Sequence, residues 1–217
     1  MVRIIYSNKD YTVAVKPYGV LSEWDENRPN MIAELSEALG TARENIFPVH
    51  RLDTTTEGLI VYALNKETAG ALSRIIADGG FCKTYIALIT AAEDLPKSGE
   101  MRDMLFFDRR QGKSFVVTEK KQGAKEAVLT YELGETFAWR NTEVTAAKVM
   151  LQTGRTHQIR AQFSARRSPL IGDGKYGSRV NFKRPSLISA AISFNWNGRR
   201  EEYTIGDISA YYPTETV

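Results

Sequence analysis

Two short segments of the sequence combine residue types that can do chemistry with glycines and apolar runs that could hold them in place. Residues 49–58 (VHRLDTTTEG) lie directly ahead of an apolar run, and residues 152–160 have the sequence QTGRTHQIR. Asp53 in the first segment can act as a nucleophile or base if a nearby cation keeps it ionised in a closed site. Arg51 and Arg160 are the candidates for that cation.

Asp53 also has an ordinary structural interpretation, because an Asp followed by three Thr residues often caps a turn with its side chain. If the segment is extended, Arg51 and Asp53 point to the same side, since they are two residues apart, and could share one cleft. The residues alone leave both interpretations open.

The second segment joins a predicted strand to a helix predicted over residues 156–165. Gly154 permits a sharp turn, and Arg155 and Thr156 fall where the helix would begin, a position that suits phosphate binding. Arg160 lies one turn further on, so that it could face the same cleft as Thr156. A surface helix with a basic face and no ligand is the alternative.

Four further side chains lie in or near predicted strands and helices, and for each a structural and a functional role are both open. His157 and Gln158 more often make structural hydrogen bonds than acid–base contacts. Lys83 and Tyr85 share one face of a strand predicted over residues 82–90. A Tyr beside a basic residue is usually half-buried surface, although its ring can also stack on a nucleobase.

The elements that must position these residues are predicted from periodicity, caps and turns. Helices are expected at 30–39, capped by Asn30 and ended by Gly40, at 66–77, capped by Asn65, and at 156–165. Strands are expected near residues 4–5, 13–15, 58–64, 82–90, 114–118, 126–133, 143–152, 186–196 and 202–205. Many strands with short connections and three helices indicate an α+β fold, a mixed and largely antiparallel sheet flanked by a few helices.

Composition narrows the class of protein. The chain has 217 residues, of which 42% are hydrophobic and 25% charged, as in ordinary globular proteins. Its one cysteine, Cys82, cannot form an internal disulfide, and two His with one Cys give no zinc spacing. The longest uncharged run falls short of the roughly 20 residues of a membrane span, and the first residues lack the apolar stretch of a signal peptide. We therefore expect a cytoplasmic protein without a metal.

Charge is distributed unevenly along the chain. Residues 148–200 contain 11 Lys and Arg against one acid, Asp173, which is a net charge of +10, whereas the whole chain carries +3. A basic segment of that size is typical of a protein with a polyanionic partner such as a nucleic acid, and a solvated basic face is the alternative. A glycine-rich stretch at 172–177 has neither Walker nor dinucleotide-binding spacing, so no nucleotide cofactor is indicated.

Taken together, these segments resemble the RluA family of pseudouridine synthases. HRLDTTTEG at 50–58 is similar to the family signature HRLD-x-x-T-S-G, and LQTGRTHQIR at 151–160 matches L-x-T-G-R-x-H-Q-I/L-R. Four shorter motifs follow the family order at 16–19 (KPYG), 83–88 (KTYIAL), 172–177 (GDGKYG) and 187–194 (LISAAISF). Glu57 departs from the usual Ser, as in the related RsuA branch, and the late motif lacks its usual His and Ala. The resemblance covers roughly residues 1–200.

The resemblance implies the pseudouridine synthase fold in a single catalytic domain over residues 1–217, with no separate RNA-binding domain. It implies that Asp53 is the catalytic carboxylate, that Arg160 pairs with it, and that Tyr85 packs on the target uracil and helps to remove the C5 proton. Whether Asp53 attacks the sugar, attacks the base or removes a sugar proton stays open. The reaction is an isomerisation, so no cofactor is expected.

The resemblance also implies how RNA is bound. Arg51 would fill the space that the flipped uridine leaves, and Leu187 would pack on the uracil opposite Tyr85. The other residues expected to bind substrate are His50, Arg155, His157 and Gln158. We expect a monomer that acts on a stem-loop of ribosomal or transfer RNA. Two alternatives remain: a catalytically silent RNA-binding module, and a glycosidase in which Glu57 is the second acid.

Overall fold

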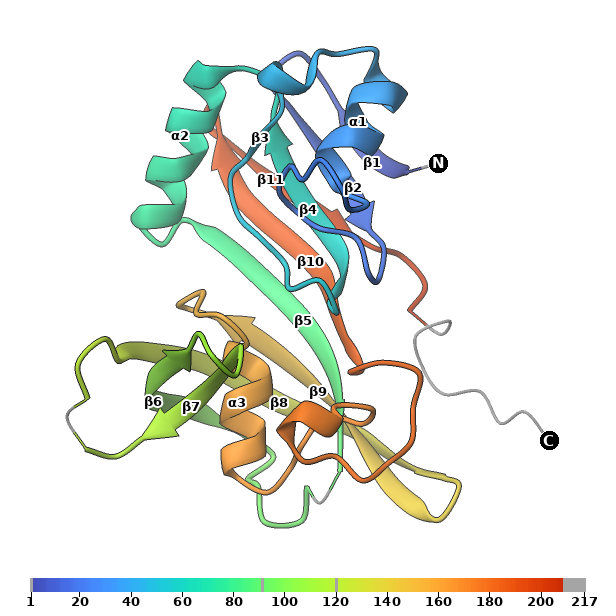
Figure 1. The fold of residues 1–217 in the computed structure, drawn as a ribbon, viewed down its shortest axis with the longest axis vertical. Helices are drawn as coiled ribbons and strands as arrows, with labels where there is room; N and C mark the ends of the chain where they lie inside the picture. The colour runs from blue at the N-terminus through green and yellow to red at the C-terminus, as the bar shows by residue number, and fades with distance from the viewer. Residues whose placement is uncertain (1, 91, 120, 209–217) are drawn as a thin grey trace. The chain divides into compact units, whose positions relative to one another are not determined.

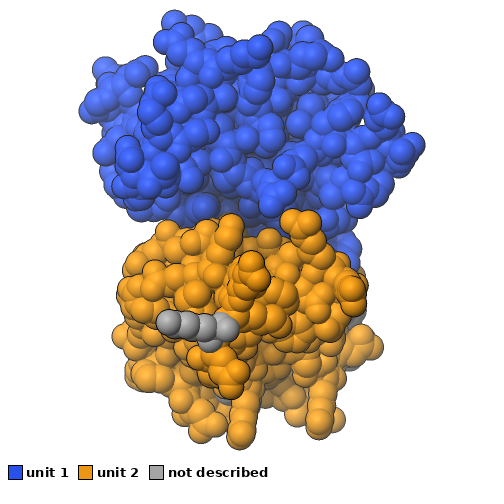
Figure 2. Space-filling view, turned by 60° about the vertical axis from the view of Figure 1, so that its left-hand side comes forward, with its two compact units in different colours: residues 1–83, 188–207 blue, residues 84–187, 208–217 orange. Residues whose placement is uncertain are grey.

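The computed structural model describes residues 2–90, 92–119 and 121–208 (Figure 1). These residues form three α-helices and eleven strands. The chain divides into two compact units, unit 1 (residues 1–83 and 188–207) and unit 2 (residues 84–187 and 208–217), coloured blue and orange in Figure 2. The predicted α+β class is confirmed, whereas the prediction of a single domain over 1–217 stays a prediction.

Unit 1 is built on a mixed sheet. Its strands are β1 (Arg3–Ser7), β2 (Tyr11–Lys16), β3 (Phe47–Pro48), β4 (Glu57–Ala63), β10 (Leu187–Trp196) and β11 (Arg199–Thr204). β2 pairs antiparallel with β1 and β4, β3 with β4, and β11 with β10, whereas β4 and β10 run parallel. The sheet therefore places β4, the strand that follows the Asp53 segment, between β2 and β10.

Both predicted helices of unit 1 are confirmed together with their caps. In α1 (Met31–Leu39) the Asn30 side chain accepts a hydrogen bond from the Ala33 N–H, and Gly40 ends the helix with a left-handed φ of 60°. In α2 (Lys66–Ala77) the Asn65 side chain accepts from the Thr68 N–H. Each cap satisfies an N–H that has no partner within its helix.

A glycine allows the close approach of β4 and β10. Gly58 has a φ of 111°, which other residues rarely adopt, and a Cβ atom there would collide with the backbone of Ser189. Gly58 and Ser189 are partners in the parallel register of the two strands. The glycine that closes the Asp53 motif is thus required by packing.

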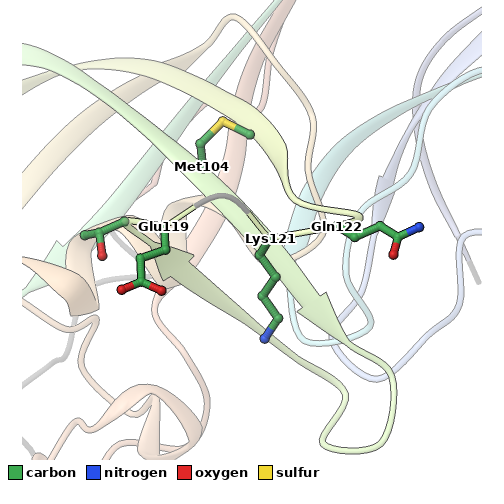
Figure 3. A pocket seen from close by; sticks show the side chains of 5 residues that line it. Met104, Glu119, Lys121 and Gln122 are labelled. Atoms are coloured by element: carbon green, nitrogen blue, oxygen red, sulfur yellow. The ribbon is translucent and has the colours of Figure 1, made fainter.

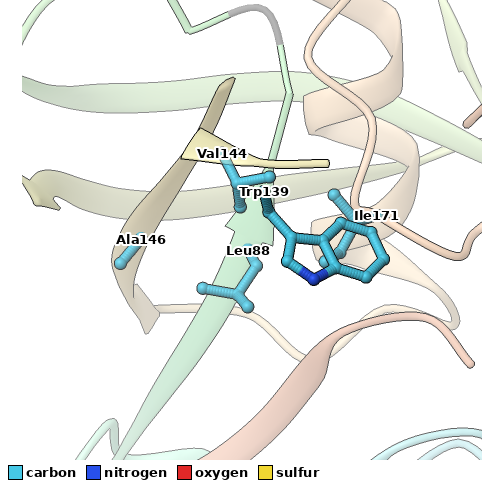
Figure 4. Packing of buried hydrophobic residues seen from close by; sticks show 5 residues of the cluster. All are labelled: Leu88, Trp139, Val144, Ala146 and Ile171. Carbon is cyan, nitrogen blue, oxygen red and sulfur yellow. The ribbon is translucent and has the colours of Figure 1, made fainter. Parts of the chain in front are cut away.

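Unit 2 contains a largely antiparallel sheet, with strands in the order β5-β9-β8-β6-β7. Its elements are β5 (Phe81–Ile89), which begins in unit 1, β6 (Ser98–Asp108), β7 (Lys113–Val117), β8 (Lys125–Trp139), β9 (Thr142–Leu151), α3 (Gln158–Ala165) and the 3₁₀ turn η2 (Gly174–Tyr176). The other 3₁₀ turn, η1 (Arg43–Asn45), belongs to unit 1. One hydrophobic cluster of unit 2 is shown in Figure 4: Leu88, Trp139, Val144, Ala146 and Ile171.

Two elements of unit 2 differ from the prediction. β6 is absent from the predicted strands, because its charged residues interrupt the alternating apolar pattern. In the structure Arg102 of β6 pairs with Glu126 of the neighbouring β8 at 3.0 Å, so this face of the sheet tolerates charge. Helix α3 begins at Gln158 and not at Thr156, because His157 takes a left-handed φ of 54°. No helix in the described parts of the chain has the length and apolarity needed to cross a bilayer.

Candidate active site

The backbone around Asp53 is held by a turn and by a buried serine. The Thr56 N–H donates to the Asp53 carbonyl at 2.9 Å, which closes the predicted turn just before β4. Buried Ser22 donates through Oγ to the Leu52 carbonyl at 3.0 Å and accepts from the Leu52 N–H at 3.1 Å. Ser22 therefore fixes the residue that precedes the candidate catalytic carboxylate.

Lys16 holds the other side of the same segment. Its side chain is completely buried, and Nζ donates to the carbonyls of Pro17 at 2.9 Å, Val20 at 2.8 Å and Thr54 at 3.4 Å. Burial lowers the pKa of Lys16 to about 8, and the negative charges of Glu57 and Asp53 oppose that shift. The ammonium thus both positions the Asp53 turn and interacts with its charge.

Two other residues of unit 1 make surface contacts near this segment. Arg51 Nη1 lies 3.0 Å from Glu23 Oε2, with exposed side-chain fractions of 63% and 56%. An ion pair this exposed stabilises by at most about 1 kcal/mol, so Arg51 can leave Glu23 at little cost. Glu57 Oε1 accepts from the Tyr18 N–H at 3.1 Å.

His50 makes a structural contact in unit 1. Its Nε2 accepts from the Val61 N–H at 3.1 Å, so the proton of the neutral ring is on Nδ1, which has no hydrogen-bond partner among the described residues. Burial, and secondarily the charge of Lys83, lowers the pKa of His50 to about 3. The expected contact of His50 with substrate stays a prediction.

Arg160 in unit 2 is held by a carboxylate that the sequence did not assign to it. Arg160 Nε lies 2.6 Å from Asp173 Oδ2 and Nη2 lies 2.8 Å from Oδ1, while the guanidinium lies 4.8 Å from the Tyr176 ring centroid. The side chains of Arg160 and Asp173 are only 4% and 1% exposed. Asp53 belongs to unit 1, and its expected pairing with Arg160 stays a prediction.

Tyr176 links the glycine-rich stretch to the turn before α3. Its hydroxyl accepts from the Ser114 N–H at 2.8 Å and lies 3.0 Å from His157 Nδ1. Burial, with the charges of Arg160 and Lys175, lowers the pKa of His157 to about 4, against the opposing effect of Asp173. The imidazole is therefore neutral at physiological pH.

The remaining expected substrate contacts lie at defined places in unit 2. Gln158 Oε1 accepts from Thr153 Oγ1 at 2.8 Å and from the Arg155 N–H at 3.0 Å, which fixes the turn ahead of α3. Arg155 Nε donates to the Glu126 carbonyl at 2.8 Å. Buried Tyr85 lies in β5 and buried Leu187 begins β10. Their expected contacts with RNA stay predictions.

The two neutral histidines give a pH prediction. Their folded pKa values, about 3 and about 4, lie below the ordinary 6.5, so below pH 6.5 the unfolded chain binds more protons than the folded one. The free energy of unfolding therefore falls as the pH drops from about 6.5 towards 4. The two histidines together lower it by up to about 2.7 kcal/mol per pH unit. Urea unfolding at pH 7 and pH 5 measures this loss. The His157→Asn variant should lose markedly less stability between the two pH values, and an unchanged loss would contradict the assignment.

A pocket of unit 2 lies outside the candidate site (Figure 3). It is lined by Met104, Thr118, Glu119, Lys121 and Gln122. None of these five side chains belongs to the residues singled out above. Within the residues that the structure describes, no group of three or more His, Cys, Asp or Glu is placed to hold a metal ion.

Comparison with known proteins identifies the family. The family model described as RNA pseudouridylate synthase matches residues 10–165. An uncharacterized RNA pseudouridine synthase of Haemophilus influenzae is 26% identical over 90% of this chain and 83% of its own. The ribosomal large subunit pseudouridine synthase D of Borreliella burgdorferi is 30% identical over 81% of this chain and 55% of its own.

Solved structures share the fold. The human RNA pseudouridylate synthase domain containing 1 superposes with a TM-score of 0.79 at 22% identity, covering 95% of this chain and 84% of that one. The match over residues 10–165 spans Asp53, Tyr85 and Arg160. The chain therefore belongs to the RNA pseudouridylate synthase family, and its expected place in the RluA branch and in the isomerase class is confirmed.

Proposed function

We propose that the protein converts a specific uridine of structured ribosomal or transfer RNA to pseudouridine, with Asp53 as the catalytic carboxylate. The observation that carries the proposal is the family match, because it includes the segments of Asp53, Tyr85 and Arg160. Relatives named as tRNA pseudouridine synthase C and as ribosomal large subunit pseudouridine synthase D support both RNA classes. We further propose a cytoplasmic monomer, in keeping with the exposed free thiol of Cys82.

The proposed reaction balances without an external reactant. The bond between N1 and C1′ breaks, the bond between C5 and C1′ forms, C5 loses its proton and N1 gains one. Nothing is oxidised or reduced. A carboxylate can assist by bonding to the sugar, by bonding to the base, or by removing a sugar proton. The target uridine must leave its stack first, at a cost of a few kcal/mol.

Hydrogen bonds hold both the Asp53 segment and the Arg160 side chain in place before RNA binds. Lys16 and Ser22 hold the backbone on both sides of Asp53, so the segment that carries the carboxylate does not have to be ordered when RNA binds. Asp173 fixes Arg160 through Nε and Nη2. We assign Arg160 as the cation that keeps Asp53 ionised, and Arg51 as the residue that fills the vacated space after leaving Glu23.

The Tyr85→Phe substitution should lower turnover by roughly 10²- to 10⁴-fold and leave RNA affinity nearly unchanged. The ring that packs on the uracil is kept, whereas the hydroxyl that would assist proton removal is lost. Single-turnover rates together with filter binding separate the two effects. If affinity falls and turnover is kept, Tyr85 binds RNA but takes no part in the proton transfer.

Chromatography of the nucleosides from treated RNA tests the proposed reaction. We expect pseudouridine to appear in place of uridine, with no free uracil. Free uracil would favour the glycosidase alternative, in which Glu57 is the second acid. Unchanged nucleosides in both RNA classes, despite tight binding, would favour the silent RNA-binding module.

A further inference from the structure

An exposed tryptophan lies on a closed loop of unit 1 that no part of the mechanism uses. We call residues 21–30 the Trp24 loop. Its base is closed by hydrogen bonds from the Leu21 N–H to the Pro29 carbonyl at 3.0 Å and from the Met31 N–H to the Leu21 carbonyl at 2.8 Å. Inside it, Asn30 Nδ2 donates to the Asp25 carbonyl at 2.8 Å. The loop is therefore closed by backbone hydrogen bonds and held inside by the Asn30 side chain.

The Trp24 loop is tied to the segment that carries Asp53. Ser22 exchanges two hydrogen bonds with the backbone of Leu52, and the Tyr62 hydroxyl donates to the Ser22 carbonyl at 2.7 Å. The next residue, Glu23, pairs with Arg51 at 3.0 Å. Trp24 thus follows two residues that contact Leu52 and Arg51, which lie one and two positions before Asp53.

Trp24 is 41% exposed, and an arginine covers one face of its ring. The guanidinium of Arg43 lies 4.4 Å from the ring centroid. Such an arrangement of a rigid indole and a planar cation is suited to stacking on a flat, electron-rich partner.

Charge on this surface distinguishes a base from a phosphate as the ligand. Each nearby arginine is paired with a carboxylate: Arg28 with Asp25 at 2.8 Å, Arg43 with Glu44 at 2.8 Å, and Arg51 with Glu23 at 3.0 Å. The Trp24 loop itself holds Glu23, Asp25 and Glu26 against Arg28, a net charge of −2, so it offers no positive charge for a phosphate. The flat face of the indole is what remains to bind RNA here.

We propose that Trp24 is a stacking platform for an unpaired RNA base close to the target uridine. The proposal rests on the proposed function, because it needs RNA at the Asp53 segment. Stacking of a base on an aromatic side chain is sequence-tolerant, so Trp24 contributes affinity and position, while the choice of uridine depends on other contacts. The adjacent Arg51 would act on the same stretch of RNA.

The test compares three substitutions, Trp24→Phe, Trp24→Leu and Trp24→Ala, on a transcript that the wild-type protein modifies. Loss of one stacked base should weaken RNA binding and raise KM by about 5- to 150-fold in the Leu and Ala substitutions, with kcat much less affected. Trp24→Phe should retain most of the affinity. The dependence of affinity on salt should be the same in all variants, because no phosphate contact is lost.

Three controls distinguish loss of stacking on Trp24 from a general effect on the surface or on the fold. Tyr6→Leu removes another exposed aromatic of unit 1 and should leave RNA binding unchanged. RNA should quench the fluorescence of the wild-type protein more than that of Trp24→Phe, in which only Trp139 and Trp196 remain. Thermal unfolding of each variant shows whether a loss comes from the fold.

Wild-type affinity and KM in the Trp24→Ala variant would overturn the proposal, and so would a Trp24→Phe variant as weak as Trp24→Ala with wild-type thermal stability. A reduced salt dependence in Trp24→Ala would also overturn it, by assigning the loss to a phosphate contact. If the wild-type protein itself modifies no RNA, the proposed function fails; fluorescence quenching that depends on Trp24 would still support stacking.

Discussion

The Asp53→Asn substitution lowers the rate of pseudouridine formation by at least about 10³-fold and leaves RNA affinity nearly unchanged, if the site acts as we propose. Asn has almost the shape of Asp, but its neutral amide is neither a nucleophile nor a base of useful strength. The turn should survive the substitution, because the Thr56 N–H donates to the backbone carbonyl of residue 53, which Asn keeps.

Single-turnover rates and filter binding on the same RNA measure the two quantities. Glu57→Gln is the matched control, since it neutralises the neighbouring carboxylate four residues away while Asp53 is kept. We expect that control to remain active. An Asp53→Asn variant that turns over at the wild-type rate would remove Asp53 from the chemistry, and an inactive Glu57→Gln variant would favour a two-carboxylate mechanism.

The Arg160→Ala substitution is expected to cost both stability and turnover. It leaves the carboxylate of Asp173, which is only 1% exposed, without its bidentate partner. Breaking a buried pair by removing one partner costs about 3–5 kcal/mol, which for a chain of this size lowers Tm by on the order of 10 °C. An activity assay of this variant alone would therefore confuse unfolding with a catalytic defect.

A double substitution separates the two effects. Arg160→Met combined with Asp173→Leu removes both charges together and should recover much of the lost stability. Replacing a buried ion pair by apolar residues of similar volume often leaves the free energy of unfolding unchanged or raises it. Turnover should remain as low as in Arg160→Ala, while RNA affinity changes far less. A stable and active double variant would show that Arg160 is needed only to balance Asp173.

Local signals in the sequence predicted the elements that depend on neighbouring residues. Asn30 and Asn65 lie directly before α1 and α2, and both caps form as expected. The predicted start of α3 at Thr156 was wrong, because Thr is a common N-cap residue. In the structure the helix begins at Gln158, whose side chain accepts the hydrogen bonds that hold the preceding turn. The sequence did not predict β6, because its charged residues interrupt the alternation of apolar and polar residues. Their pairing with residues of the neighbouring strand cannot be detected from that alternation.

The residues that contact one another in the candidate site are distant in sequence. The motifs therefore identify candidate residues but do not identify their partners. Asp173 is the one acid of a basic segment and part of the motif at 172–177, but its pairing with Arg160 depends on the course of the chain between them. Lys16 belongs to the motif at 16–19, but that motif does not predict that its ammonium donates to backbone carbonyls. Ser22 carried no signal in the sequence.

Release of tritium from RNA transcribed with uridine tritiated at C5 tests the central claim most directly. Formation of pseudouridine changes no mass but frees the C5 hydrogen to water, so the release reports the reaction itself. With ribosomal and transfer RNA offered separately, we predict release from at least one class, at a rate that depends on Asp53. No release from either class, while the protein binds both tightly and in a salt-dependent manner, would contradict the account.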